Sequence, residues 1–401
     1  MSNIIYVDNN ATTRIAPAVL DAMMPFYTES YGNPSSMHAF GGNVARSVNK
    51  AREQAAALIN ASPEEIIFTS CGTESDSTAI WATISSIPDK KHIITSRVEH
   101  PAVKNLYEHL AKKGYKVTFV PVDRQGNLDL DFFYDHLTDD TALVSIMWAN
   151  NETGVIFPID EITRAANDKG VVLHTDAVQA VGKIPVDVQK TNVDLLSFSG
   201  HKIHAPKGVG ALYVRKGTKF TPFLIGGHQE KGRRGGTENV ASIVGLGKAS
   251  ALAADLPNTS MLEVARLRDR LETGLVSHVQ NAMINGDTTS RLPNTTNISF
   301  EYIEGESILL MMNELNICAS SGSACTSGSL EPSHVLRAMG IPFTAAHGSI
   351  RFSLSHYNTE EEMDFIVDKM PPIIDRLRQM SPFWNQGKPD DSMLTGAECP
   401  L

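Results

Sequence analysis

The sequence predicts an α/β fold in which a mostly parallel sheet is covered by helices on both faces, with a smaller α+β domain after it. The first observation is an alternation, between residues 65 and 215, of short apolar runs with helical stretches of about 10–15 residues. The second is a change of pattern from Ala282 onward, where short apolar runs and helices no longer alternate regularly. Hydrophobic residues make up 42% of the 401 residues and charged residues 20%, so the chain can form a substantial core.

Each strand is expected where a run of apolar and β-branched residues ends in polar or small ones. The expected strands are 4–7, 65–70, 92–96, 115–122, 142–149, 171–176, 193–199 and 211–215. Helices are expected from Pro17, at 42–60, at 102–114, from Ile159, at 240–279 with a break at Pro257, at 305–315 and at 359–380. The segments 31–41 and 222–239 are rich in glycine and other turn-forming residues and are expected to be loops.

These elements divide the chain into four parts. Residues 1–14 are expected to be an N-terminal segment that joins the small domain, 15–256 a large domain, and 257–382 the small C-terminal domain. The tail, 383–401, has little periodicity and is expected to be disordered or loosely attached.

Charge and cysteine content exclude several classes of function. The net charge is −10 and the chain has no dense Lys/Arg run, which argues against nucleic acid and anionic membranes as partners. No apolar stretch reaches the length of a membrane span and the N-terminus lacks a signal-peptide pattern, so a cytoplasmic protein is expected. The cysteines Cys71, Cys318, Cys325 and Cys399 form no CxxC pair, and a disulfide framework is not expected. A lone cysteine in a polar loop is then a candidate nucleophile.

The most informative residue is Lys202, which follows the apolar run 193–198 almost directly. An ammonium near a core of low dielectric constant is disfavoured, so the amine becomes a better nucleophile. Such a lysine can form a Schiff base with an aldehyde cofactor. The alternative is a surface lysine in a basic loop, since Lys207 follows closely.

Further polar residues lie at or just after predicted strand ends, where ligands bind in parallel sheets. They are His100, Asn151, Asp176, Gln179, Ser199, His201 and Lys202. Gly72 and Thr73 lie between a strand and the start of a helix, and the free backbone N–H groups there favour an anion such as phosphate. Thr73 as a simple N-cap is an equally good local interpretation.

Asp176 needs a partner at the end of a buried strand, and a protonated pyridine nitrogen is one. The alternatives are a helix N-cap or a metal pair with His174, for which no third ligand has suitable spacing. Gln179 can donate to a phenolate oxygen, and Ser199 can donate to a phosphate, as can His201. His100 can stack on a ring and move protons, or can be a capping or core histidine.

Motifs along almost the whole chain, up to about residue 382, resemble one family. They are DNNATT at 8–13, YGNPSS at 31–36, EHPAV at 99–103, WANNETG at 148–154, HTDAVQ at 174–179, SGHKIHAPKGVG at 199–210, RRGGTEN at 233–239 and SSGSACTSG at 320–328. The chain is similar to the pyridoxal-phosphate cysteine desulfurases of the class V aminotransferase superfamily. The loop of about 320–332 resembles the branch with a long, mobile cysteine loop. The sequence most resembles the NifS type, which serves nitrogenase iron–sulfur assembly, and is close to the housekeeping IscS type.

The resemblance implies the fold of PLP-dependent transferases (fold type I) and pyridoxal 5′-phosphate as the cofactor. Lys202 would hold the cofactor covalently, Asp176 would pair with its ring nitrogen, Gln179 would bond its ring oxygen and His100 would stack over the ring. The implied phosphate ligands are Gly72, Thr73, Ser199 and His201, with Thr237 from the other subunit of a homodimer.

For the reaction, the resemblance implies that L-cysteine becomes L-alanine. Asn151 and Arg351 would hold the substrate carboxylate, and Cys325 would take the sulfur as a persulfide and pass it to a scaffold protein of the NifU or IscU type. No intrinsic metal is implied, although Cys325 can bind a nascent iron–sulfur cluster shared with the scaffold. The alternatives are a selenocysteine lyase, another class V transaminase, or a sulfur-carrying scaffold without turnover.

Overall fold

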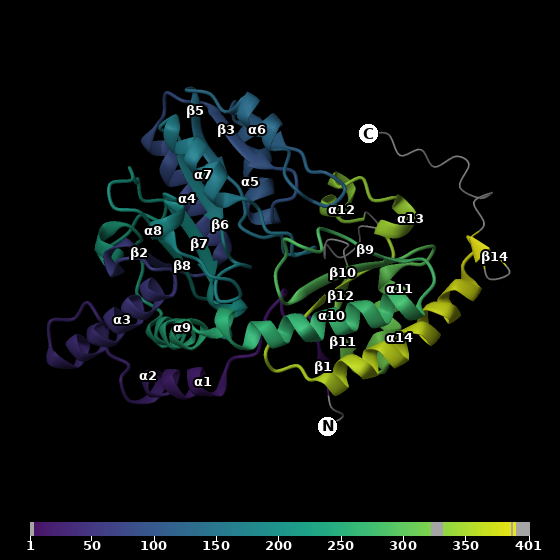
Figure 1. Cartoon of the computed structure of the whole chain (residues 1–401). Coiled ribbons are helices and arrows are strands. Elements are labelled where there is room, and N and C mark those ends of the chain that lie inside the picture. Colours follow the sequence, from purple (N-terminus) through teal and green to yellow (C-terminus); the bar gives the residue numbers. More distant parts are fainter. Residues whose placement is uncertain (1–3, 322–331, 386–387, 390–401) are drawn as a thin grey trace.

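The computed structural model describes residues 4–321, 332–385 and 388–389. Its larger part is built on a seven-stranded sheet (Figure 1). In spatial order the strands are β2 (Ile66–Thr69), β8 (Gly210–Val214), β7 (Leu195–Ser199), β6 (Val172–Asp176), β5 (Thr141–Ser145), β3 (His92–Ser96) and β4 (Lys116–Val120). β8 runs antiparallel to both of its neighbours and the remaining pairs are parallel. The predicted mostly parallel α/β fold is therefore confirmed.

Successive residues of the central strands face opposite layers of helices. Ile93 packs against α4 (Gly72–Ser86) and α5 (Pro101–Lys112), whereas Ile94 belongs to the core on the other face. Since both faces are covered, successive residues of the central strands are buried instead of alternating between buried and exposed. The other helices of this part are α1 (Pro17–Met23), α2 (Pro25–Thr28), α3 (Ala39–Leu58), α6 (Leu130–His136), α7 (Ile159–Asp168), α8 (Val188–Thr191) and α9 (Val240–Ala253).

The smaller part has an antiparallel sheet with the strand order β12, β13, β10, β9. These strands are Ser320–Ser321, Ser349–Ser353, Thr295–Phe300 and Ala282–Ile284. The long helices α10 (Ser260–His278) and α14 (Glu360–Met380) lie side by side against it (Figure 1). Shorter helices are α11 (Gly305–Glu314), α12 (His334–Ala338) and α13 (Phe343–Ala346).

The N-terminal segment belongs to the core of the smaller part. β1 (Ile5–Tyr6) pairs in parallel with β11 (Ile317–Cys318), and Ile5 and Val7 are buried among the side chains of that core. The segment then crosses to the large sheet, where Thr13 N donates to His201 O at 2.9 Å. Residues 8–13 therefore lie between the two parts.

Two details refine the sequence interpretation. The stretch 240–279 breaks where expected: α9 ends at Ala253, a 3₁₀ turn covers Leu256–Asn258 and α10 begins at Ser260. Val240–Asn258 is also apolar and long enough to span a membrane, but half of it is buried inside the protein, as in a core helix.

The predicted tail begins with an ordered segment, which the lack of periodicity did not indicate. β14 (Trp384–Asn385) pairs with β15 (Lys388–Pro389), and the Arg378 guanidinium lies 4.3 Å from the centre of the Trp384 ring. Residues 390–401 lie outside the described part of the chain.

Candidate active site

One cavity of about 350 Å³ lies beyond the carboxyl ends of the large sheet's strands. Of the predicted site residues that the structure describes, all except Thr237 line it. Those that line it are Gly72, Thr73, His100, Asn151, Asp176, Gln179, Ser199, His201, Lys202 and Arg351. Residues from β6, β7 and the starts of α4 and α5 thus meet residues of the smaller part at one place.

Lys202 ends a short 3₁₀ turn that directly follows β7. Its Nζ donates to the carbonyl oxygens of Asn10 and Ala11, the second at 2.8 Å. Burial, together with the nearby Arg351 guanidinium, lowers the pKa of this lysine to about 8, although the carboxylates of Asp176 and Asp8 oppose the shift. A neutral amine is therefore far more accessible here than on a surface lysine, as a nucleophile requires.

Asp176 is the last residue of β6, and its Oδ1 accepts from Val178 N at 2.9 Å. Burial raises its pKa to about 6, against the opposing effects of that hydrogen bond and of the Lys202 charge. Asp76 of α4, which the sequence analysis did not single out, is buried and lines the same cavity. Its Oδ1 lies 3.6 Å from His174 Nε2.

His174 does not pair with Asp176 as a metal ligand. Its two ring nitrogens lie 2.8 Å from Ser145 Oγ and 3.0 Å from Ser197 Oγ, so both are already hydrogen-bonded. Within the described ranges, no group of three or more His, Cys, Asp or Glu side chains could hold a metal ion. The predicted pairing of Asp176 with a pyridine nitrogen remains compatible with this geometry.

The start of α4 forms an anion cradle. Its N-cap residue, Cys71, makes no side-chain cap, so the first-turn N–H groups of the helix face the cavity uncapped. A Cβ at Gly72 would lie 3.0 Å from Val178 Cγ2, which only glycine avoids without displacing that side chain. Ser199 Oγ is buried and has no hydrogen-bond partner among the residues that the structure describes. An unpaired hydroxyl beside an uncapped helix is suited to a phosphate.

His100 is the N-cap of α5, and its Nδ1 accepts from Ala102 N at 3.2 Å. Burial, together with the positive charge of Lys202, lowers its pKa to about 4. The ring is therefore neutral at pH 7, and its proton is on Nε2 because Nδ1 is the acceptor.

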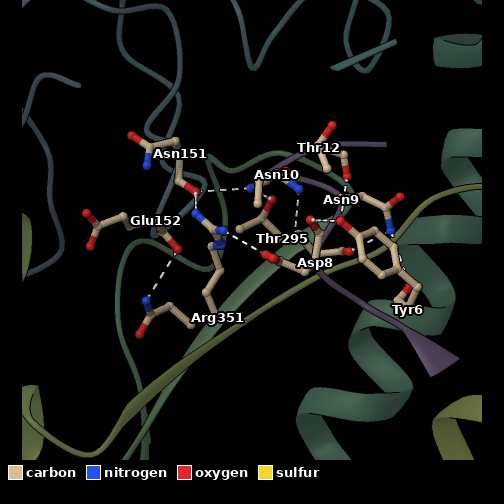
Figure 2. Close-up of polar contacts among 12 residues, drawn as sticks. Tyr6, Asp8, Asn9, Asn10, Thr12, Asn151, Glu152, Thr295 and Arg351 are labelled. Carbon is tan, nitrogen blue, oxygen red and sulfur yellow. Dashed lines mark hydrogen bonds and ion pairs between the residues drawn. The ribbon is translucent and has the colours of Figure 1, made fainter. Parts of the chain in front are cut away.

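Arg351 of β13 closes the cavity from the side of the smaller part. Its Nη1 donates to Asn151 O at 3.1 Å and its Nη2 to Asp8 Oδ1 at 2.8 Å (Figure 2). Its Nε is buried and unpaired within the described residues. A guanidinium held in this way still has a donor to offer, as binding of a carboxylate requires.

Sequence reasoning missed Asn10, although it belongs to the DNNATT motif. Its Nδ2 donates to Asn151 O at 3.1 Å and to Thr295 Oγ1 at 2.9 Å, which links the two parts of the molecule (Figure 2). It also missed Lys183, a second buried lysine, whose Nζ donates to Gln179 Oε1 at 2.5 Å and Asn10 Oδ1 at 3.2 Å. The sequence feature that could have indicated Lys183 is its spacing of four residues from Gln179.

Of the two remaining predicted residues, Thr237 lies away from the cavity and Cys325 is not among the described residues. Thr237 is exposed in the loop after η3 (Gln229–Gly232), where Arg234 Nε donates to Glu74 Oε1 at 2.8 Å. This ion pair fixes the loop against the start of α4. Cys325 lies outside the described residues, as does Cys399; Cys71 lines the cavity, and Cys318 lies half-buried in β11.

Comparisons with known proteins agree with this architecture. The sequence pattern of the class V aminotransferases matches residues 5–366. A cysteine desulfurase of Trichormus azollae is 59% identical over 383 residues, 96% of each chain. The cysteine desulfurase NifS of Azotobacter vinelandii is 57% identical over 386 residues, again 96% of each. The solved structure of a NifS-like protein has a TM-score of 0.88 at 41% identity and covers 94% of this chain and 100% of its own.

Enzymes of this family depend on pyridoxal 5′-phosphate, and the cavity supplies what that cofactor needs: an amine, a carboxylate and an anion cradle. The family match spans far more than half of the chain, and the relatives cover nearly all of it. The chain therefore belongs to the class V aminotransferase family and, within it, to the cysteine desulfurases of the NifS type.

Proposed function

We propose that the chain is a pyridoxal-phosphate-dependent enzyme that converts L-cysteine to L-alanine and transfers the sulfur to Cys325 as a persulfide. The observation that carries the proposal is the meeting of Lys202 and Asp176 in one cavity with the unpaired hydroxyl of Ser199. Asp176 ends β6, and Lys202 ends the 3₁₀ turn that follows the neighbouring strand β7. Ser199 is the last residue of β7 and lies beside Gly72 at the uncapped start of α4. Amine, carboxylate and anion cradle together match the aldehyde, ring nitrogen and phosphate of this cofactor.

The bound cofactor supplies an electron sink that stabilises negative charge on the substrate's α-carbon. Lys202 would hold the cofactor through Nζ, and its free amine would take and return the proton of the substrate's α-carbon. Asp176 keeps a proton on the ring nitrogen, and Gln179 donates to the ring oxygen. The phosphate is bound by the backbone at Gly72 and by the side chains of Thr73, Ser199 and His201.

The substrate carboxylate is bound on the opposite side of the cavity by Arg351 and Asn151. Asp8 already accepts a hydrogen bond from Arg351, so the substrate carboxylate would compete with Asp8 for the guanidinium. Neutral His100 stacks on the cofactor ring.

Sulfur transfer is the step in which Cys325 acts. Its thiolate attacks the substrate sulfur, a new S–S bond forms as the substrate's C–S bond breaks, and the electron pair stays on the carbon that becomes alanine. His100 is a candidate base for the thiol. That role would require Nδ1 to give up its hydrogen bond from Ala102 N, or a tautomer with the proton moved off Nε2.

A homodimer completes the proposed site, with Thr237 reaching the phosphate of the partner subunit. Thr237 is exposed in this chain and lies away from its own cavity. Large apolar side chains are exposed in segments 20–40 and 223–225, as expected for surfaces that a second subunit covers. They are Leu20, Met24, Tyr27, Tyr31, Met37, Phe40, Phe223, Leu224 and Ile225.

The proposed role is supply of sulfur for iron–sulfur clusters, including those of nitrogenase, through a scaffold acceptor of the NifU or IscU type in the cytoplasm. Similarity to NifS of Azotobacter vinelandii supports it over a housekeeping IscS role. The presence of Lys202 and Asp176 in one cavity supports an enzyme over a scaffold that only carries sulfur. A cysteine nucleophile would distinguish it from a transaminase, and faster turnover of L-cysteine than of L-selenocysteine would distinguish it from a selenocysteine lyase.

An absorbance spectrum together with alanine and sulfide assays tests the proposal. The purified protein should be yellow and should release both products from L-cysteine, whereas Lys202→Ala should lose the visible band of the lysine-bound cofactor. Retention of that band and of full activity by Lys202→Ala would show that the assignment is wrong.

A further inference from the structure

Lys183 is a buried lysine that the proposed reaction does not use. It follows Gln179 by four residues, in the turn region that comes after β6. Gly182, beside it, has a φ of +77°, and a Cβ there would lie 2.8 Å from Ile203 Cγ2. The positive φ at this position favours glycine, and the resulting turn directs the Lys183 side chain toward Gln179 in the preceding turn.

The Lys183 amine touches two acceptors. It donates to Gln179 Oε1 at 2.5 Å and to Asn10 Oδ1 at 3.2 Å. Burial lowers the pKa of Lys183 well below its usual range, and the facing cations Lys202 and Arg351 add to the shift. A neutral amine still has two N–H donors, so both contacts can be made in either protonation state.

The orientation of Asn10 is fixed by other contacts. Its amide oxygen also accepts from Asn294 Nδ2 at 3.1 Å, and its amide nitrogen donates to Asn151 O and Thr295 Oγ1. The oxygen therefore has to face Lys183. The side chain of Asn10 provides a fixed second contact for the lysine.

Gln179 can then adopt only one of its two amide orientations. Its Oε1 faces the Lys183 donor, and its Nε2 donates to the carbonyl oxygen of Asn10 at 3.1 Å. Rotating the amide by a half-turn would place N–H groups against a donor and an oxygen against an acceptor. The second hydrogen on Nε2 remains available on the side of the cavity that Gln179 lines.

We propose that Lys183 is a positioning residue that holds the Gln179 amide with its N–H groups toward the cofactor, so that Gln179 can only donate there. The inference rests on the proposed function, which identifies the acceptor as the negative ring oxygen. When cofactor is bound to Lys202, deprotonation of the Schiff-base nitrogen leaves a negative charge on the ring oxygen. A hydrogen bond donated to the ring oxygen stabilises this charge and therefore lowers the pKa of the Schiff base.

The test is a double-mutant cycle read by absorbance titration of the holoenzyme, a measurement independent of turnover. The proteins are the wild type, Lys183→Met, Gln179→Met and the double variant. Each single variant should raise the pH midpoint of the cofactor's spectral transition by about one unit, because the hydrogen bond from Gln179 to the negatively charged ring oxygen is lost. The double variant should shift no further than the larger single shift.

Two controls separate this effect from a loss of charge or of folding. Lys190→Met removes an exposed cation and should leave the midpoint unchanged. Lys183→Gln keeps N–H donors without a charge and should stay near the wild-type midpoint, and it can be measured even where Lys183→Met does not fold.

Several results would overturn the inference. One is a shift in Gln179→Met but none in Lys183→Met. Others are a double variant whose shift equals the sum of the two single shifts, or a Lys183→Gln midpoint as high as that of Gln179→Met. If the Gln179→Met midpoint equals that of the wild type, Gln179 does not bond the ring oxygen, and this inference is wrong as well. A wild-type protein without the cofactor band would overturn the proposed function itself.

Discussion

Arg351 Nη2 donates to Asp8 Oδ1 at 2.8 Å, so the guanidinium proposed to bind the substrate already has a carboxylate partner. The two residues come from opposite ends of the chain and meet because β13 and the N-terminal segment pack side by side. An incoming carboxylate has to share the guanidinium with Asp8.

This pairing predicts opposite effects for two substitutions. Arg351→Gln removes the cation and should weaken binding of L-alanine, which has the carboxylate but no sulfur, by about tenfold or more. Asp8→Asn keeps an oxygen acceptor and removes the competing charge, and should tighten binding about threefold. Dissociation constants from spectral titration of the holoenzymes measure both. If Asp8→Asn weakens binding as much as Arg351→Gln, Asp8 acts by positioning the guanidinium rather than by competing for it.

Burial of Lys202 predicts the pH dependence of cofactor loading. With a pKa of about 8, roughly a quarter of the amine is neutral at pH 7.5, against about one part in a thousand for an ordinary lysine. The neutral form is the nucleophile, so the rate at which apoprotein takes up pyridoxal phosphate should rise with pH and level off above about 8. Stopped-flow absorbance measures this rate.

Arg351→Gln is the matched variant for that experiment. The guanidinium is the second cause of the lowered pKa of Lys202, so its removal should move the rise to higher pH. A wild-type rate that keeps rising toward pH 10 would contradict a lowered pKa.

The residues that were singled out from the sequence and that line the cavity follow from one local rule. Polar residues such as Asp176 and Lys202, placed directly after buried strands, meet because parallel strands end at the same edge of a sheet. The antiparallel direction of β8 could also have been predicted from the sequence. The connection Gly200–Val209 has no room for a crossover helix, which a parallel neighbour requires.

The residues that were missed depend on long-range packing. Asn10 reaches Lys183 only because the N-terminal segment crosses between the two parts of the molecule, a contact that no periodicity encodes. Asp76 lies inside α4, where a polar residue is expected on the solvent side of the helix, yet the structure buries it against the sheet.

Asp176→Asn is expected to lower turnover at least ~100-fold. Asparagine preserves the shape of the side chain, and its oxygen can still accept from Val178 N, but it has no negative charge to retain the ring-nitrogen proton. Alanine production at saturating L-cysteine measures the loss, and the cofactor's visible band shows that the site is still loaded. Turnover near the wild-type rate would show that the reaction does not require the Asp176 carboxylate.

The exposed position of Thr237 predicts a site shared between subunits. Lys202→Ala and Thr237→Ala homodimers should each be weakly active. If subunits exchange at random, half of the dimers are mixed and one of their two sites is intact, so about a quarter of the wild-type activity should return. No recovery after confirmed exchange would indicate a site built within one chain.

The central claim is that Cys325 takes the sulfur while Lys202 and Asp176 serve the cofactor. Mass spectrometry of peptides from the wild-type protein, after one turnover with L-cysteine and without reductant, tests it most directly, with alanine measured in parallel. The account predicts a gain of about 32 Da, the mass of one sulfur atom, on the Cys325 peptide of the wild type and of a Cys71→Ser control. Cys325→Ala should bind L-cysteine but form almost no alanine. A sulfur adduct on Cys71, Cys318 or Cys399 instead, or alanine release by Cys325→Ala at the wild-type rate, would contradict it.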